Sequence, residues 1–243
     1  MESWPRLSNP PIVEGLIDIR VTPAPNITFA ELRAACEELA ADFPSRQERR
    51  MFRTEFQYTE SAGASAQTTD TGPDGVILRS ADNRWVAQFR LDGFTVSRLQ
   101  PYGTWSDLKA RAESLWDMYA RSSKPTKILR VATRFINRVQ LPAGEPFGNT
   151  FLTSFVIGAD LPQAVAAYLL RVVIPFEEVG AVAIVTQSLE PNGAACILDV
   201  DAYSEHPAGL AETEMWTRLE DLRGVKNRLF FGSFTQIALE RFK

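Results

Sequence analysis

Residues 128–139 read ILRVATRFINRV, and their charged and apolar side chains alternate with a period of two. Successive side chains of a strand point to opposite faces, so this period predicts a half-buried strand over 128–141. One face then carries three arginines, whereas the other is mostly apolar. The first face comprises Arg130, Ala132, Arg134, Ile136 and Arg138, and the second comprises Val131, Thr133, Phe135, Asn137 and Val139.

Residues 12–22 (IVEGLIDIRVT) alternate in the same way and predict a second half-buried strand. Its apolar face includes Ile17 and Ile19. The polar positions of this strand are Glu14, Asp18 and Arg20. By the same parity one face of a strand over 85–91 carries Gln88 and Arg90, together with Arg84 just before it, and one face of a strand over 195–203 carries Asp199 and Asp201. Charges therefore recur on one face of several predicted strands.

Two helices are predicted to begin at capping boxes, in residues 28–31 (TFAE) and 104–107 (TWSD). In this motif a threonine and an acidic residue three positions later satisfy free amides of the first turn. The first helix should reach about Phe43, and the second should end near Ser123, because a proline follows each of these residues closely. The inward row of the second helix begins at Trp105.

The rest of the chain divides into short strands and one further helix. In the first half we predict strands over 50–58, 76–78, 85–91 and 94–99. A mobile loop is predicted over 61–75, where Ser, Ala, Thr and Gly show no apolar periodicity. In the second half, strand-like runs occupy 151–158, 166–175, 181–189 and 195–203, and a helix spans about 211–231. Asn192 and Gly193 are expected to form a hairpin turn.

Both halves of the chain, 1–124 and 125–243, can be written as strand, helix or short connection, four strands and helix. We interpret this order as an internal duplication of a β-α-β4-α unit within a single globular unit over residues 1–243. The alternative is a single irregular sheet whose halves match by coincidence. The predicted fold class is α+β, with a mostly antiparallel, curved sheet and helices on one face, in the form of a saddle or a partly closed barrel. The other face would be free for a ligand.

Composition sets the broad class of protein. The chain has 243 residues, of which 45% are hydrophobic and 23% charged, with a formal net charge of −4. Disorder is excluded, and nucleic acid and anionic lipid are not expected partners, because no excess of positive charge would attract them. The start lacks the pattern of a signal peptide, and the longest apolar run is too short to span a membrane. With two cysteines, Cys36 and Cys196, both inside apolar patterns, we expect a protein of the reducing cytoplasm.

Catalytic signatures are easier to exclude than to find. The chain has neither of the glycine-rich loops that hold phosphates, and it lacks the G-x-S-x-G turn of hydrolases. His206 is the only histidine, which excludes a site with several histidine ligands. We expect it in a solvated turn.

The charged strand positions allow two readings. As a site, the arginine forks would bind a carboxylate or a phosphate, and the candidate ligand-binding residues are Arg130, Arg134, Arg138, Arg20 and Arg90. As structure, they would pair with carboxylates of neighbouring strands on a solvated sheet face. We favour the structural reading. The run of Arg46, Arg49, Arg50 and Arg53 could form a small anion patch, but acidic residues are mixed into it, which favours a solvated connection between a helix and a strand.

Four stretches together resemble a sporadically distributed bacterial family of uncharacterised proteins of similar length. They are residues 9–14 (NPPIVE), 91–98 (LDGFTVSR) followed by Tyr102 and Trp105, 130–138 (RVATRFINR), and 198–203 (LDVDAY). The resemblance covers nearly the whole chain. It implies a bacterial cytoplasmic protein and no particular activity or catalytic residue.

Two hypotheses of function follow. The first is a non-catalytic binding or adaptor protein, without a cofactor, whose sheet face or helices hold another protein or a small anionic ligand. The second is a metal-dependent phosphohydrolase or triphosphate-processing enzyme that uses a charged sheet face or tunnel. Its metal would be magnesium, with Glu14, Asp18, Asp199 and Asp201 as ligands. The chain lacks the tight Glu-x-Glu-x-Lys pattern of such enzymes, so we favour the first hypothesis.

Overall fold

Strands β1 (Ile12–Thr22) and β6 (Lys127–Gln140) pair antiparallel in the middle of the sheet. The computed structural model describes residues 4–59, 63–142, 144–191 and 193–243, and within these ranges one sheet contains nine strands. Their order is β2-β3-β4-β5-β1-β6-β9-β8-β7. The other strands are β2 (Ser45–Thr59), β3 (Gly63–Arg79), β4 (Trp85–Arg90), β5 (Gly93–Leu99), β7 (Leu169–Phe176), β8 (Ala181–Leu189) and β9 (Ala195–Leu210). All pairings are antiparallel, which confirms the predicted class of sheet.

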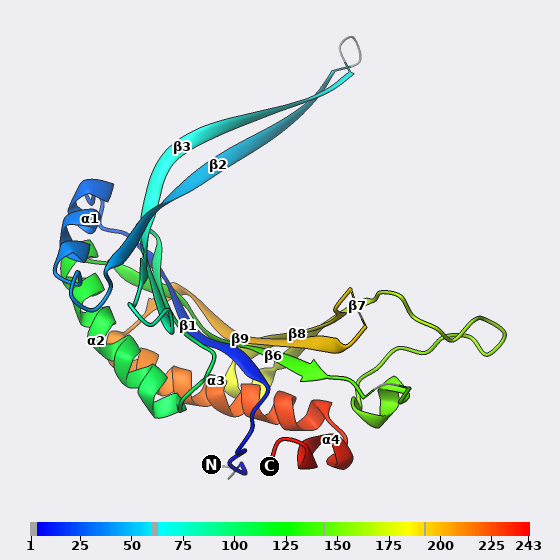
Figure 1. The fold of residues 1–243 in the computed structure, drawn as a ribbon. Coiled ribbons are helices and arrows are strands. Elements are labelled where there is room, and N and C mark those ends of the chain that lie inside the picture. Colours follow the sequence, from blue (N-terminus) through cyan, green and yellow to red (C-terminus); the bar gives the residue numbers. More distant parts are fainter. Residues whose placement is uncertain (1–3, 60–62, 143, 192) are drawn as a thin grey trace.

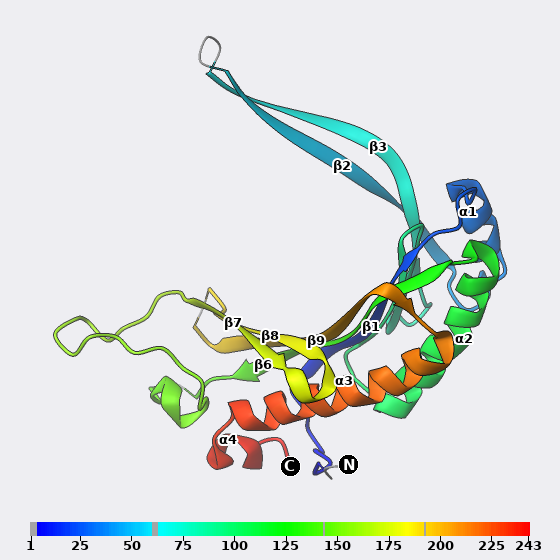
Figure 2. The same cartoon turned by 180° about the vertical axis from the view of Figure 1, so that it is seen from behind.

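Four helices lie on one face of the curved sheet, on its outer side (Figures 1 and 2). They are α1 (Phe29–Glu37), α2 (Trp105–Ser123), α3 (Glu212–Ser233) and α4 (Gln236–Glu240). The opposite face of the sheet is called here the open face, because no helix of the described ranges covers it. The helices and the open face are therefore separated by the thickness of a single sheet.

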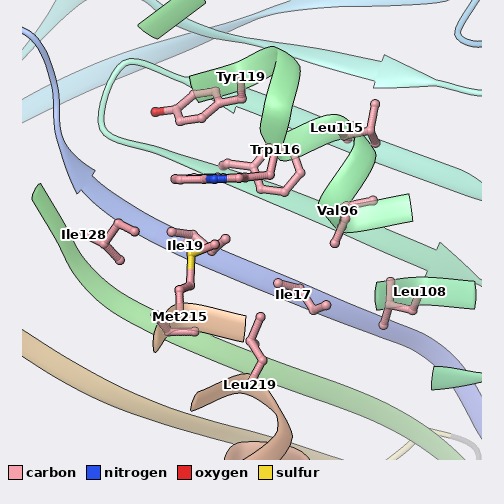
Figure 3. Packing of buried hydrophobic residues seen from close by; sticks show 14 of the residues in the cluster. Ile17, Ile19, Val96, Leu108, Leu115, Trp116, Tyr119, Ile128, Met215 and Leu219 are labelled. Carbon is pink, nitrogen blue, oxygen red and sulfur yellow. The ribbon is translucent and has the colours of Figure 1, made fainter. Parts of the chain in front are cut away.

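The main core lies between the sheet and helices α2 and α3 (Figure 3). Ile17 and Ile19 of β1 are fully buried, with Trp116 of α2 and Leu219 of α3 nearby. This arrangement confirms the predicted parity of β1, because the positions between them face away from the helices. Cys36 and Cys196 are both buried free thiols, as expected.

Both predicted capping boxes are present, at Thr28 for α1 and at Thr104 for α2. Helix α2 ends at Ser123, as predicted. Helix α1 stops at Glu37 and not at Phe43, because the amides of residues 38–40 bond to carbonyls three positions back. These tighter turns still bury the Phe43 side chain, so the apolar row predicted the burial correctly but not the end of the helix.

The prediction of a mobile loop over 61–75 is wrong for the residues that the structure describes. Residues 63–75 belong to β3, which pairs with β2 along nearly its whole length. Residues 61 and 62 lie outside the described ranges. The outer parts of β2 and β3, residues 49–59 and 63–74, project from the molecule as a two-stranded ribbon, called here the arm (Figure 1). The arm buries no face against a core, so residues 63–75 carry no apolar periodicity even though their backbone is paired, whereas the strand predicted over 50–58 is confirmed as part of β2.

Two further predictions fail in the second half, and for the sheet as a whole one of the two predicted forms is excluded. Residues 151–158 form no strand, apart from an isolated bridge between Phe151 and Phe234. Strand β9 continues to Leu210, so His206 lies on a strand and its ring bonds to the Ser204 hydroxyl at 2.9 Å. The sheet ends at β2 and at β7, so it is open and is not a partly closed barrel. Asn192 of the predicted hairpin turn lies outside the described ranges.

Among the described residues, none of the helices is long and apolar enough to cross a membrane.

Candidate functional site

The predicted arginine row of β6 lies on the open face. Val131, Thr133 and Phe135 are buried toward the helices, whereas Arg130 and Arg134 are only half-buried on the other side. Asp18 of β1 lies opposite Thr95 on one neighbouring strand and Ala132 on the other. Strand pairing thus brings charges from β4, β1, β6 and β9 together on this face.

Asp18 is the centre of a continuous ion-pair network. Its carboxylate accepts hydrogen bonds from Arg90 at 2.9 Å, from the Thr95 hydroxyl at 2.7 Å and from Arg130 at 3.3 Å. Arg20 reaches the same carboxylate at 3.4 Å. We call this group, with Asp92 and Asp201 at its two ends, the Asp18 network. It joins side chains that are far apart in sequence.

Two glycines make room for Arg90, the most deeply buried cation of the network. Its side chain is only 6% exposed and lies between Gly75 of β3 and Gly93 of β5, which are its partners on the two adjacent strands. A Cβ atom at Gly93 would approach an Arg90 guanidinium nitrogen to 2.6 Å, and one at Gly75 would lie 3.2 Å from its Cγ. A larger residue would also meet a backbone carbonyl oxygen, that of Ile19 at 2.5 Å from position 93 and that of Phe89 at 2.7 Å from position 75, so neither position has room for a side chain beside Arg90.

The pKa values of the two carboxyls that lie deepest in the network shift in opposite directions. Burial alone would raise the pKa of Asp18, but Arg90, Thr95 and Arg20 together lower that pKa below its usual value. In Asp201 burial dominates and raises the pKa, although Arg130 lies 3.2 Å away and opposes the shift. Arg130 also packs over the Tyr203 ring, 4.3 Å from its centroid. Of the two carboxyls that Arg130 bridges, Asp18 therefore holds its negative charge more strongly than Asp201.

The other two arginines of the row are paired as well. Arg134 makes two hydrogen bonds to Asp199, at 2.8 and 2.5 Å, and Arg138 makes two to Glu190, at 2.6 and 2.7 Å. Such parallel bonds use both sides of the guanidinium fork. The five candidate ligand-binding arginines therefore all have carboxylate partners, as the structural reading requires.

The metal-site hypothesis finds no support in this geometry. Asp18, Asp199 and Asp201 are held by arginines, and Glu14 lies across from Leu99 and Ile136. In the ranges that the structure describes, no group of three or more His, Cys, Asp or Glu side chains is placed to hold a metal ion. No observation on this face favours triphosphate chemistry.

The arm carries a second set of exposed features. Its arginines are paired, Arg49 with Asp74 and Arg50 with Asp70, each at 2.7 Å, so the expected helix-to-strand connection is part of β2. Phe52 and Phe56 lie four residues apart in β2, so their side chains point to the same face of the strand. They are 61% and 81% exposed, respectively. Large apolar side chains at such exposure add nothing to a core, and sequence analysis did not single them out.

A cavity of about 550 Å³ lies on the opposite side of the sheet from the Asp18 network. Residues 4–10, called here the strap, border it together with the start of α2, strand β6 and helix α3. Trp4 of the strap stacks on Phe231 with ring centroids 5.1 Å apart, and the Asn9 amide donates to the Phe242 carbonyl at 2.9 Å. We call this space the strap cavity.

A missing side chain in β1 shapes the wall of the strap cavity. A Cβ at Gly15 would lie 2.7 Å from the Tyr102 ring and 2.8 Å from the Phe135 ring. Glycine therefore lets both rings pack directly on the strand, where they meet edge to face at 5.4 Å. Trp105 lies beside Phe135 and fixes the adjoining wall, because its indole nitrogen donates to Glu220 at 3.0 Å.

Lys226 of α3 is the unusual charge of this cavity. Its ammonium lies 4.0 Å from the centroid of the Phe135 ring and donates to the Asn227 amide oxygen at 2.6 Å. Burial, with a smaller contribution from Arg223, lowers the pKa of Lys226 to about 7. Sequence analysis missed this residue. The available signal was its spacing of four from both Leu222 and Phe230, which are buried, so that Lys226 lies on the inward side of the helix.

The comparisons with known proteins leave the family open. No protein-family model matches the chain, and no curated protein matches it. Among solved structures, the crystal structure of DynU16, from the dynemicin biosynthetic locus, is similar with a TM-score of 0.23 and 17% sequence identity, covering 94% of this chain and 99% of that chain. At that TM-score the likeness carries no argument about function. The bacterial family suggested by the four sequence stretches stays a prediction.

Proposed function

We propose that this protein is a binding protein of the adaptor type, and that it holds an extended segment of a partner protein along the edge of the arm. The observation that carries the proposal is the exposure of Phe52 and Phe56 on a ribbon that projects from the core (Figure 1). An isolated two-stranded hairpin is only marginally stable in water. An arm of this length with exposed aromatic rings is therefore better suited to contact another molecule than to support the fold.

The edge position of β2 supports the kind of partner. Strand β2 is the last strand of the sheet, so its outer backbone groups are available to an added strand within the described structure. In this mode of recognition, main-chain hydrogen bonds supply affinity and pockets for alternate side chains supply specificity. Phe52 and Phe56 lie on the same face of the strand, as alternate anchors require.

The charges of the arm favour a protein over a nucleic acid. A nucleic-acid surface needs unpaired cations for the phosphates. Arg49 and Arg50 are neutralised by Asp74 and Asp70. The chain as a whole is negative, with a formal net charge of −4.

We also infer that the two halves arose by duplication of a unit smaller than the predicted β-α-β4-α, namely one strand, three further strands and a long helix, because the described part of the second half has only three strands after β6 and no α-helix between β6 and β7. The strand order supports this inference, because β5-β4-β3 follow β1 outward on one side while β9-β8-β7 follow β6 on the other. A long helix, α2 or α3, closes each half. In this scheme β2 has no counterpart in the sheet of the second half, which makes the arm an addition to the repeated framework.

The experiment compares partner recovery by a double variant, Phe52→Ser with Phe56→Ser, and by a control, Leu161→Ser. Leu161 is similarly exposed, at 59%, but lies outside the arm. Each tagged protein is used to purify partners from its native host, and the complexes are analysed by amide hydrogen exchange. We expect the double variant to stay folded and lose a partner that the control retains, and we expect the β2 amides to be protected in the wild-type complex. Full retention by the double variant, or unprotected β2 amides, would contradict the proposal.

A further inference from the structure

The charges that line the strap cavity all have one sign. Among the described residues that border it, Arg6, Arg223 and Lys226 carry positive charge, and none carries a carboxylate. Arg223 is partly balanced by Glu220, at 3.3 Å. Lys226 forms no salt bridge with a described residue, and its one hydrogen bond goes to a neutral amide. Half-buried cations are stabilised by a nearby anion, and none of the described residues that border the strap cavity supplies one to Lys226.

Two further polar atoms, from residues that border the cavity, have no partner among the described residues. The side-chain oxygen of Asn137 is buried without a hydrogen bond, while the amide nitrogen of the same side chain donates to the carbonyls of Phe135 and Leu198. The Tyr102 hydroxyl is also buried and unpartnered. Leaving such groups unsatisfied costs free energy, whereas a bound molecule with a hydrogen-bond donor would satisfy Asn137.

The remaining walls combine aromatic and apolar side chains with the polar residues Ser8, Thr104 and Asn227. Trp105, Phe135, Phe230 and Trp4 border the cavity, and its volume of about 550 Å³ is in the range of small-molecule sites. Phe135 contacts both the Lys226 ammonium, 4.0 Å from its ring centroid, and the Tyr102 ring, which meets it edge to face. A flat apolar body with an acidic group at one end matches this arrangement.

We propose that the strap cavity binds a small aromatic carboxylate, with the carboxylate held by Lys226 and Arg223 and the ring placed among Trp105, Phe135 and the strap. A hydroxyl or N–H group of the ligand donates to the Asn137 side-chain oxygen. The site is independent of the arm, because it lies on the helix side of the sheet and uses none of the residues of β2 and β3.

Calorimetric titration of the full-length protein tests the ligand class. The probe is 4-hydroxyphenylacetate, which has a ring, a carboxylate and a hydroxyl donor. The comparators are its neutral carboxamide, phenylacetate without the hydroxyl, and phenyl phosphate. We expect the carboxamide to bind at least about tenfold more weakly and phenylacetate to bind more weakly as well. Undetectable binding of the probe at millimolar concentration, equal binding of the carboxamide, or tighter binding of phenyl phosphate would overturn the proposal.

Two variants locate the site. Lys226→Met keeps the length of the side chain and removes its charge, so the dissociation constant of the probe should rise at least about tenfold. Arg134→Gln removes a cation from the open face and should leave that constant unchanged. Equal binding by wild type and Lys226→Met would overturn the assignment of Lys226, and so would an equal loss in both variants.

A labelling experiment on the wild type keeps the test decisive if Lys226→Met does not fold. Amines are acetylated with and without saturating probe, and the modified lysines are identified by peptide mass spectrometry. Lys226 should be protected by the probe, whereas Lys127, an exposed residue of β6, should not. Unchanged modification of Lys226 would contradict the proposal.

Discussion

Strand β6 presents polar groups to both faces of the sheet, and the two faces differ in whether those groups are paired. On the open face Arg130 and Arg134 bond to Asp201 and Asp199. On the helix side the structure describes no hydrogen-bond partner for the Asn137 side-chain oxygen and no carboxylate paired with Lys226 among the residues that it covers. The sequence pattern suggested a candidate site on the open face, because three arginines alternate there. The structure favours a candidate site on the helix side instead.

This difference distinguishes paired charges, which stabilise the sheet, from unpaired charges, which can bind a ligand. A paired guanidinium has used its donors, so it stabilises neighbouring strands and has little left to offer an anion. An unpaired buried ammonium lowers stability in the empty protein and recovers that loss when an anion binds. The Asp18 network is therefore structural, and the strap cavity is the stronger candidate for small-molecule recognition.

The largest effect is expected at the wall of the strap cavity. Trp105→Ala removes a buried indole that connects α2 to Glu220 of α3, and we expect a loss of about 3 to 5 kcal/mol in the free energy of unfolding. The control is Phe56→Ala, an aromatic truncation at an exposed position, which should change stability by less than about 0.5 kcal/mol. Urea denaturation measures both. Similar losses of stability in the two variants would show that Trp105 does not contribute to the packing of the core.

Breaking the Asp18 network is expected to cost nearly as much. Asp18→Asn leaves the buried Arg90 without its main counter-ion, and we expect a loss of about 3 kcal/mol at pH 7. Asp92→Asn, at the exposed end of the network, should cost far less. Asp18 has a lowered pKa in the folded state, so its contribution is present above about pH 3.8 and is lost as the pH falls through the folded value. The difference between wild type and Asp18→Asn should therefore narrow in acid, and a constant difference would contradict this account.

The unpaired Lys226 predicts a pH effect of the opposite kind. Its pKa falls from 10.5 to about 7 on folding, so between these values the unfolded chain binds more protons and the stability of the fold rises with pH. From pH 7 to pH 9 this one group should contribute about 1 to 2 kcal/mol, and Lys226→Met should lack that slope. The charged or titratable groups that also face the cavity are Arg223, Arg6 and Tyr102, and they are unchanged in the variant. Parallel stability curves for wild type and variant would contradict the prediction.

The smallest effect is expected on the open face. Arg134→Gln breaks a half-exposed pair with Asp199, and we expect a loss of about 1 kcal/mol or less, because water screens the charges. Recovery of a partner by the arm should not change. Loss of that partner with the fold intact would show instead that the arginine row is a binding surface.

The sequence predicted faces and several boundaries well, because these depend on local periodicity and on caps. The parity of β1 and β6 and the first residues of α1 and α2 were all predicted correctly. The strand predicted over 50–58 is confirmed as part of β2, but its partner over 63–75 was missed, because backbone hydrogen bonds satisfy that pairing and it buries no core side chains. Residues 151–158 were predicted as a strand because their apolar residues mimic one, although in the described structure their only strand-like pairing is the bridge between Phe151 and Phe234.

By itself, the sequence determined which side chains of β6 share a face, since backbone geometry alternates them wherever the strand lies. Only the tertiary structure decided what each one meets. Arg134 finds Asp199 across 65 residues, and Arg130 finds Asp18 across 112, through the order and register of the strands. Packing of β6 against α3 and the strap places Asn137 and Lys226 in the wall of one cavity, with no anion from the described residues that line it. The cost of an unpaired charge is a property of its surroundings, and those are assembled only when distant segments pack together.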